Sequence, residues 1–301
     1  MKLTILGCYS AVPRKDTNPT AQVLEIKNHV FLIDCGEGTQ VRLRQHRIKF
    51  NRIKHIFISH LHGDHYFGLI GLISTFRLLT RDTELHIHGP KGIKEIITLQ
   101  LKMSDSWTNF PLIFHELESK NSQLVFEDDT VSVSTIPLDH RVYCNGFLFR
   151  EKPGERQLDL GAALNANIHK SYFQKLKQGA DVLNENGKLI PNETVTRPPK
   201  PVKSYAFCSD TAYDEDIVPM IKNVDTLYHE STFLDKNEAL CKTTKHSTAR
   251  QAAKIAKKAG VNKLILGHYS TRYDNLQLFQ EEALEEFSQV VLAEDGKVFS
   301  L

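Results

Sequence analysis

The chain has 301 residues, 41% of them hydrophobic and 25% charged, which is ordinary for a globular protein of one large domain or two average ones. Its formal net charge of +2 is too small to indicate a nucleic-acid partner, so such a partner has to be argued from where the charges lie. Its five cysteines are odd in number and form no Cys-x-x-Cys pair, which excludes a disulfide framework and predicts buried free thiols.

The N-terminal run from Met1 to Gly7 is too short for a signal peptide and lacks a small-residue cleavage site, so we expect it to be a strand. The most apolar stretch, Tyr66 to Leu79, is shorter than the roughly 20 residues that cross a bilayer, and Gly68 and Gly71 interrupt it. We therefore expect a cytoplasmic protein without a membrane partner.

Short β-branched runs, separated by turn residues or by helical patterns, predict strands at residues 3–6, 22–26, 30–33, 53–58, 131–136, 204–207, 226–228 and 263–266. Helical patterns lie at residues 66–79, 92–103, 214–221, 248–258 and 276–287, and Ser247 is a plausible N-cap for the fourth. The early strands follow one another like hairpins, and the later ones alternate with helices. This mixture predicts sheets covered by helices in one α/β domain over residues 1–301.

A basic segment from Arg150 to Lys203 differs from the rest of the chain. It carries ten Lys or Arg residues against six acidic ones, so its net charge is +4 and the remainder of the chain sums to −2. Turn formers such as Pro153-Gly154 and Pro198-Pro199 indicate an inserted arm. Residues 168–179 of this arm contain no acid, and in isolation they would be interpreted as a solvated surface helix. Their three cations are Lys170, Lys175 and Lys177.

Metal-ligand side chains follow the predicted strand at 53–58 directly. In an extended stretch His60 and His62 project to the same side, so both imidazoles can reach one metal ion. We expect Gly63 to let the backbone turn and bring Asp64 and His65 to a second ion. Imidazole and carboxylate ligands suit Zn²⁺, and open α/β sheets build their sites at the carboxyl ends of strands.

Two metal ions need more ligands than these, and three candidates lie just past other predicted strands: His140, Asp210 and His268. A carboxylate at position 210 can bridge two cations through its two oxygens. The remaining histidines lack this placement and are assigned no ligand role; they include His46, His55, His86, His88, His115 and His169.

Two such metal ions polarise a phosphoryl or carbonyl oxygen and lower the pKa of water towards ~7, and a phosphodiester suits them well. The leaving alkoxide then needs a proton. His246 is a candidate general acid, and Glu230 is a candidate for the carboxylate that orients it.

Taken together, the ordered motifs of this chain resemble those of the short form of the ribonuclease Z family, tRNA 3′-processing endonucleases of the metallo-β-lactamase superfamily. The resemblance runs essentially end to end. The motifs are Asp34-Cys35-Gly36-Glu37-Gly38-Thr39-Gln40, the segment from His60 to His65, Pro137-Leu138-Asp139-His140, Cys208-Ser209-Asp210-Thr211, His229-Glu230-Ser231-Thr232, His246-Ser247-Thr248 and His268-Tyr269-Ser270-Thr271-Arg272-Tyr273.

The resemblance implies two Zn²⁺ ions per subunit and a role for each candidate residue. It places one ion on His60, His62 and His140 and the other on Asp64, His65 and His268, with Asp210 between them. Asp64 is also the implied proton acceptor for the attacking water, and His246 with Glu230 serves the leaving group. The implied reaction removes the 3′ trailer from precursor tRNA, leaving a 3′-hydroxyl on the tRNA and a 5′-phosphate on the trailer.

The resemblance also implies a metallo-β-lactamase fold, a four-layer αβ/βα sandwich, a homodimer, and an exosite arm at residues 150–203 that grips the tRNA elbow. Phosphate contacts from such an arm would be salt-dependent and largely independent of sequence. Two segments depart from the family pattern. Thr17 stands where the N-terminal loop usually has Arg, and Asn167-Ile168-His169-Lys170 replaces the Gly-Pro pair common at the arm tip.

Two other functions remain open from the residues alone. A hydrolase of the same fold acting on a small ester would use the same zinc ligands, but it would need neither the basic arm nor His246. A non-catalytic RNA-binding protein that keeps zinc for folding would bind precursor tRNA without cleaving it.

Overall fold

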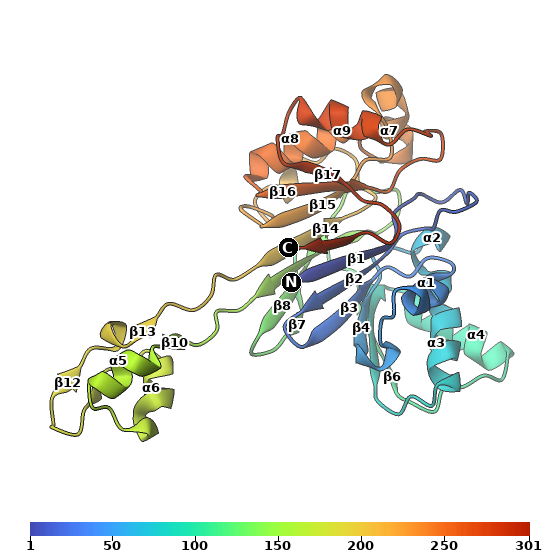
Figure 1. The fold of residues 1–301 in the computed structure, drawn as a ribbon. Helices are drawn as coiled ribbons and strands as arrows, with labels where there is room; N and C mark the ends of the chain where they lie inside the picture. Colours follow the sequence, from blue (N-terminus) through green and yellow to red (C-terminus); the bar gives the residue numbers. More distant parts are fainter. The chain divides into compact units, whose positions relative to one another are not determined.

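Two seven-stranded β-sheets form the centre of this computed structural model, which describes residues 1–301 (Figure 1). The first sheet has the order β18-β1-β2-β3-β4-β5-β6. Its strands are β1 (Lys2–Gly7), β2 (Ala21–Ile26), β3 (His29–Ile33), β4 (Ile53–Phe57), β5 (Leu85–Pro90), β6 (Leu112–Leu117) and β18 (Val298–Ser300). The strands from β3 to β6 are parallel, whereas β1 pairs antiparallel with both β2 and β18.

The second sheet has the order β17-β16-β15-β14-β9-β8-β7, and its strands from β14 to β17 are parallel. They are β7 (Leu124–Glu127), β8 (Val131–Pro137), β9 (Asn145–Glu151), β14 (Ser204–Cys208), β15 (Thr226–Glu230), β16 (Lys263–Gly267) and β17 (Val290–Leu292). Parallel strands need crossover connections, which the helices between them supply.

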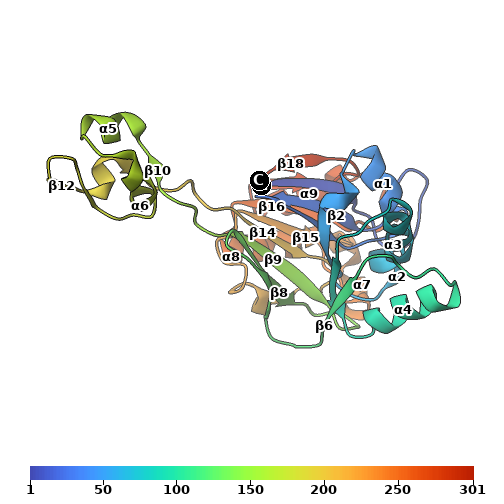
Figure 2. The same cartoon turned by 90° about the horizontal axis from the view of Figure 1, so that it is seen from below.

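Helices cover the outer face of each sheet (Figures 1 and 2). On the first sheet these are α1 (Thr39–Gln45), α3 (Gly68–Leu78) and α4 (Ile93–Met103); on the second they are α7 (Glu238–Thr244), α8 (Ala249–Ala259) and α9 (Gln277–Leu284). The short helix α2 (Gly63–Tyr66) precedes α3, and the 3₁₀ turns are η1 (Phe50–Arg52), η4 (Glu215–Ile217) and η5 (Asp235–Asn237). The predicted four-layer αβ/βα sandwich is thus confirmed.

Strand β3 illustrates why the layers form. Phe31 and Ile33 point into the core shared with the second sheet, and the alternate residues Val30 and Leu32 join the core beneath α1, α3 and α4. All four are apolar because a central strand of such a sandwich is buried on both faces.

Several predicted helices differ from those in the structure. The pattern at 214–221 was wrong as a helix, because only η4 forms there. Pro219 has no N–H with which to continue an α-helix, and the Asp214 carboxylate accepts from the Asp216 N–H, which favours a tight turn. The pattern at 66–79 is divided at Phe67 between α2 and α3, and that at 276–287 is shorter as α9.

The N-cap of α8 is Thr248, not the predicted Ser247. The Thr248 hydroxyl accepts from the Gln251 N–H, and the Gln251 side chain accepts from the Thr248 N–H, which completes a capping box. The Ser247 hydroxyl instead donates to the Thr211 carbonyl at 2.7 Å.

The structure divides into two compact units, and residues 151–202 form the smaller one. Its elements are β10 (Gln157–Leu158), α5 (Leu160–Asn165), η2 (Lys170–Tyr172), α6 (Phe173–Lys177), β11 (Val182–Leu183), β12 (Leu189–Ile190), η3 (Asn192–Thr194) and β13 (Thr196–Arg197). Ile168, Leu176 and Val182 contribute to its own small core. Residues 168–179 are therefore not one surface helix: η2 and α6 divide them, and Leu176 is buried. No helix of the chain is long and apolar enough to cross a membrane.

Four of the histidines that were given no ligand role stack on one face of the first sheet. His55 of β4 lies over His86 of β5, with ring centroids 4.6 Å apart, and His88 lies over His115 of β6 at 4.3 Å. Burial, followed by repulsion from the neighbouring imidazoles, lowers the pKa of His55 to about 3 and that of His88 to about 2. These rings are therefore neutral at pH 7.

This stack predicts acid lability. In the unfolded chain a histidine takes up a proton near pH 6.5, whereas His88 stays neutral in the native protein. The contribution of the neutral His88 to the free energy of unfolding is therefore fully present above pH 6.5 and is lost as the pH falls below it. Between pH 7 and 5 we expect the wild type to lose about 2 kcal/mol more of its free energy of unfolding than His88→Phe, measured by urea denaturation. The exposed His169→Phe is the control; a wild-type pH dependence retained in His88→Phe would contradict the prediction.

Candidate metal centre and active site

The predicted ligands come from loops that leave both sheets at one edge. His60 and His62 follow β4, His140 follows β8, Asp210 follows β14 and His268 follows β16. Asp64 and His65 lie in α2, whose N-cap is His62. The structure brings all seven together into two neighbouring groups. This placement agrees with the general position of sites at the carboxyl ends of strands.

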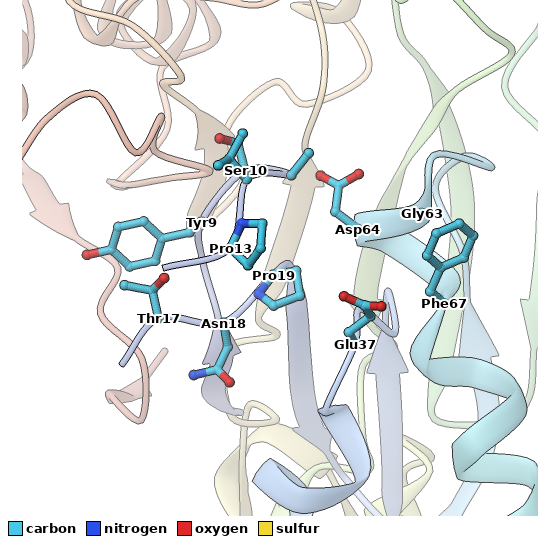
Figure 3. Close-up of a pocket in the computed structure, with 12 residues that line it drawn as sticks. Tyr9, Ser10, Pro13, Thr17, Asn18, Pro19, Glu37, Gly63, Asp64 and Phe67 are labelled. Atoms are coloured by element: carbon cyan, nitrogen blue, oxygen red, sulfur yellow. The ribbon is translucent and has the colours of Figure 1, made fainter. Parts of the chain in front are cut away.

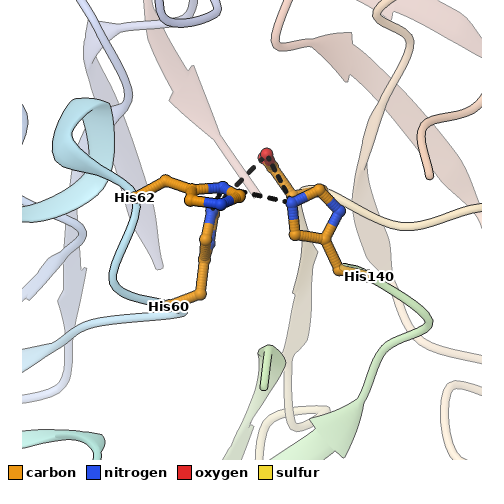
Figure 4. A group of neighbouring side chains, drawn as sticks. His60, His62 and His140 are labelled. Carbon is orange, nitrogen blue, oxygen red and sulfur yellow. Dashed lines mark hydrogen bonds and ion pairs between the residues drawn. The ribbon is translucent and has the colours of Figure 1, made fainter. Parts of the chain in front are cut away.

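The first group joins three imidazoles and one carboxylate (Figure 4). His60 Nε2 lies 2.9 Å from His62 Nδ1, which lies 3.2 Å from His140 Nε2. Asp210 Oδ2 lies 3.6 Å from His60 Nε2 and 3.8 Å from His140 Nε2. A tetrahedral zinc ion with ligands at about 2.05 Å spaces them about 3.3 Å apart, so the spacing fits such an ion.

The second group joins two imidazoles and two carboxylates. His65 Nε2 lies 3.4 Å from Asp64 Oδ2 and 3.2 Å from Asp210 Oδ1. His268 Nε2 lies 3.6 Å from Asp64 Oδ2 and 3.1 Å from Asp210 Oδ1. Asp210 therefore turns one oxygen towards each group, which is the geometry of a bridging carboxylate.

Two further observations test whether these residues suit a metal ion. His65 Nε2 and His268 Nε2 are buried and have no hydrogen-bond partner, although buried polar atoms normally have one. Burial lowers the pKa of His60, His62 and His140, so these imidazoles are neutral at pH 7, the form that binds a metal. Both groups could hold a divalent cation.

The carboxylates stay ionised despite their burial. Burial alone would raise the pKa of Asp64, but the adjacent His65 and His268 hold it well below its usual range. Burial would likewise raise the pKa of Asp210, but the neighbouring His268, His65 and His60 hold it well below its usual range. Burial alone would lower the pKa of His65, but the nearby carboxylates of Asp210, Asp64 and Asp34 raise it well above its usual value, so these carboxylates favour a positive charge at this position.

Asp34 holds the candidate ligand His65 and was assigned no role from the sequence. Its Oδ2 accepts from His65 Nδ1 at 2.7 Å, and its Oδ1 accepts from the Ser59 N–H at 2.8 Å. With Nδ1 engaged in this way, Nε2 of His65 faces the second group and is the atom that would bind a metal ion. The rule that found His140 and His268 would have found Asp34 too, because it follows β3 directly.

A hydrogen-bonded chain connects the second group to His246. His268 Nδ1 donates to the Thr232 hydroxyl at 2.9 Å, which donates to Glu230 Oε2 at 2.7 Å. Glu230 Oε1 accepts from His246 Nδ1 at 2.8 Å. The Thr211 and Thr232 amides also donate to this fully buried carboxylate.

The Glu230 carboxylate sets the protonation of His246. Burial would lower the pKa of His246, but the charge and hydrogen bond of Glu230 raise it to about 9. The imidazole is thus a cation at pH 7. The His246 imidazole lies beside Asp210 and His268, so its Nε2 can present a proton next to the two groups of candidate ligands.

Three residues of this centre have a left-handed backbone. Asp34, Asp210 and His268 have φ angles of 55°, 57° and 57°, in the left-handed region that costs most residues about 1–2 kcal/mol. The backbone turn expected at Gly63 is the start of α2, where Gly63 has no positive φ, and a Cβ there would clash with the Phe67 ring. Space for that ring accounts for this glycine.

A pocket of about 280 Å³ opens beside Asp64 (Figure 3). The N-terminal loop lines it with Tyr9, Thr17 and Asn18, and Phe67 lines the other side. The Thr17 hydroxyl donates to the Arg14 carbonyl at 3.4 Å, and Arg14 is ion-paired with Asp274. Thr17, which stands where the ribonuclease Z family usually has Arg, therefore lies in the wall of the pocket that contains Asp64.

Asp34→Asn tests the orienting role of the buried carboxylate. Loss of its negative charge weakens the hold on His65 Nδ1, and we expect metal affinity to fall by about 10- to 100-fold, measured by competition with a chelating dye. Asp128→Asn is the control, because that carboxylate binds His29 at 2.6 Å outside the metal groups. Equal affinities in both variants would contradict the assignment.

Comparison with known proteins gives close relatives along the whole chain. The chain is 45% identical to "Ribonuclease Z" of Bacteroides thetaiotaomicron, over 100% of this chain and 95% of the relative. The family model of anti-Pycsar protein Apyc1 matches residues 1–153.

Solved structures agree with these matches. Human tRNase Z, short form, superposes with a TM-score of 0.73 at 28% identity, over 100% of this chain and 99% of the other. A metallo-β-lactamase fold protein of Bacillus subtilis has a TM-score of 0.68 at 18% identity, with 99% and 98% covered. The second likeness shows the fold alone, and the expected metallo-β-lactamase fold is confirmed.

Proposed function

Because the chain belongs to the ribonuclease Z family, and its N-terminal half also falls in the Apyc1 family, we propose that it is an endoribonuclease that removes the 3′ trailer from precursor tRNA. The Apyc1 match ends before Asp210, Glu230, His246 and His268. The ribonuclease Z match includes them and the basic unit at 151–202. The function is therefore argued from the full-length relatives.

The single observation that carries the chemistry is the division of the Asp210 carboxylate between the two groups. Its Oδ2 faces His60, His62 and His140, and its Oδ1 faces His65 and His268. We assign two Zn²⁺ ions to these groups, because imidazole nitrogen and carboxylate oxygen are a usual zinc donor set. When bound, the ions supply Lewis acidity to a phosphodiester and to water.

Side chains of the protein move the protons. Asp64, which is ionised and therefore free to take up a proton, accepts the proton of the attacking water as the phosphorus–oxygen bond to the tRNA 3′ oxygen breaks. His246 donates its Nε2 proton to that leaving oxygen while Glu230 holds Nδ1. The products are a tRNA with a 3′-hydroxyl and a trailer with a 5′-phosphate. Sequencing both RNA ends from one precursor tRNA tests the proposal; internal cuts elsewhere, or uncut RNA, would contradict it.

The smaller unit supplies the cations for tRNA binding in this proposal. Lys170 and Lys175 are exposed, Lys177 is half-buried, and Lys175 Nζ lies 5.6 Å above the Tyr172 ring. Phosphate contacts from this unit would bind any tRNA alike. The family resemblance also predicts a homodimer, which light scattering of the purified protein tests.

Replacing the smaller unit tests its role in binding. Arg150 of β9 pairs with Ser204 of β14 in antiparallel register, so an Asn-Gly turn between Glu151 and Lys203 closes the gap as a hairpin. We expect kcat/KM for precursor tRNA to fall by about 10²-fold, because three charge-assisted contacts are lost. Hydrolysis of an aryl phosphodiester should persist; a parallel loss of both activities would show that the unit is needed for the fold or the metal centre.

A further inference from the structure

A second cavity, of about 690 Å³, lies at the amino-terminal ends of β4 and β5, whereas the candidate metal ligands lie beyond the carboxyl end of β4. Its wall includes Lys49, Phe50 and Asn51, which precede β4, and Arg81, which precedes β5. The metal ligands follow the far end of β4, and a strand of five residues spans about 17 Å. The cavity is therefore separate from the catalytic centre.

The lining combines cations with an apolar wall. Arg44, Arg47, Lys49 and Arg81 line the cavity, and no acidic residue does. The other lining residues are Ile48, Phe50, Asn51, Phe76 and Leu79. No ion pair neutralises any of the four cations. A volume of this size, with apolar walls and a few polar groups, is typical of small-ligand sites.

Arg81 is the unusual member of this set. Its residue is 6% exposed, and its guanidinium lies 4.8 Å from the Phe76 ring centroid and 5.5 Å from that of Phe110. Nε and Nη2 donate to the Thr83 and Glu84 carbonyls, but the buried Nη1 has no hydrogen-bond partner. Burial lowers the pKa of Arg81, and the charge of the neighbouring Asp82 opposes this effect without forming an ion pair. A buried cation that has no ion pair favours a further anion nearby.

The local backbone holds two of the cations in place. Helix α1 ends with the Arg47 N–H donating to the Arg44 carbonyl and the Ile48 N–H donating to the Leu43 carbonyl, a Schellman turn. Arg47 occupies the left-handed position of this turn, with φ of 56°, where glycine is usual. Helix α3 ends in the same turn, and its Arg81 N–H donates to the Phe76 carbonyl at 3.1 Å. Both arginines are thus fixed at helix ends.

We propose that this cavity binds the phosphate group of a nucleotide. The cations of Arg44, Arg47 and Lys49 at its rim would bind the phosphate oxygens, with the charge of Arg81 beneath them, while Phe50 and Leu79 offer an apolar wall to the base. A free nucleotide and a nucleotide unit of an RNA chain share this chemistry, and they are distinguished below.

The test uses the metal-loaded protein and adenosine 5′-monophosphate as the probe, with binding measured by equilibrium dialysis. Arg47→Ala/Lys49→Ala removes two exposed cations of the cavity, and Arg77→Ala/Lys102→Ala removes two exposed cations outside it. We expect the wild type and the control variant to bind the probe at the metal centre and in the cavity. The cavity variant should lose the second site or weaken it by about tenfold or more, at unchanged metal content.

The same two variants distinguish the sources. If RNA fills the cavity, the dependence of precursor-tRNA affinity on salt should fall by about 1.5 in log–log slope in the cavity variant alone. If a free nucleotide fills it, that slope stays at the control value while the probe site is lost. Probe binding and RNA slope both equal to those of the control variant would overturn the proposal.

Discussion

Replacing Asp64 by asparagine is expected to lower the rate of precursor-tRNA cleavage by more than about 10³-fold while most of the bound metal is retained. The amide keeps an oxygen at the position of Oδ2, 3.4 Å from His65 Nε2 and 3.6 Å from His268 Nε2, so the second group keeps its fourth ligand atom. The amide cannot accept the proton of the attacking water. Single-turnover cleavage and metal content by mass spectrometry measure the two effects separately.

Asp139→Asn is the matched control for this experiment. The Asp139 carboxylate lies next to His140 in sequence, but it pairs with Lys245 Nζ at 2.7 Å and belongs to neither group. Its loss should leave most of the cleavage rate. Full cleavage by metal-loaded Asp64→Asn would sink the assignment of Asp64 as proton acceptor, and loss of metal with loss of rate would reduce Asp64 to a ligand.

His246→Gln is expected to slow precursor-tRNA cleavage by about 10²- to 10⁴-fold, because the tRNA 3′ oxygen leaves poorly without a proton. An activated aryl phosphodiester, whose phenolate leaves without protonation, should be hydrolysed at nearly the wild-type rate. The His246 side chain packs beside His140, with ring centroids 5.3 Å apart. Glutamine is similar to histidine in size, so this substitution should leave no large cavity. The ratio of the two rates is the measurement.

The partner of His246 supplies the comparison. Glu230→Gln keeps a hydrogen-bond acceptor for His246 Nδ1 but removes the negative charge that stabilises the imidazolium. We expect Glu230→Gln to lower the rate of precursor-tRNA cleavage by less than His246→Gln does, and to leave hydrolysis of the aryl phosphodiester nearly unchanged. Equal losses on both substrates in either variant would indicate damage to the metal centre instead of a missing general acid.

The positions of the candidate ligands could be predicted because they obey a local rule. An apolar strand is followed within three residues by His or Asp at His140, Asp210 and His268, and the carboxyl ends of neighbouring strands meet in space. The rule also fits the position of Asp34 after β3, but it says nothing of its hydrogen bond to His65. The role of Thr232 could not be predicted in the same way, since it depends on a hydrogen bond to His268, 36 positions away. Such contacts are set by the fold.

Strand β5 shows where the pattern fails for another reason. Its alternation of apolar residues with histidine is short and ends at Gly89 and Pro90, which are typical of turns, and no strand was predicted there. The structure buries His88 at 1% exposure among other aromatic rings, where the neutral imidazole behaves as an aromatic side chain. Burial keeps His88 neutral, and a neutral imidazole can pack in an apolar core, which the sequence pattern alone does not show.

The pairing of β1 with β18 has a consequence for how the protein folds during synthesis. Lys2 lies opposite Ser300, and the Cys8 N–H donates to the Asp295 carboxylate, so β1 cannot form these contacts until the residues between it and β18 have been synthesised. Contacts of such sequence separation slow folding and leave edges unpaired on the ribosome. His60 and His62 are translated long before Asp210 and His268. A complete metal centre can therefore form only when the C-terminal strands have left the exit tunnel, and until then the nascent chain has no assembled nuclease site.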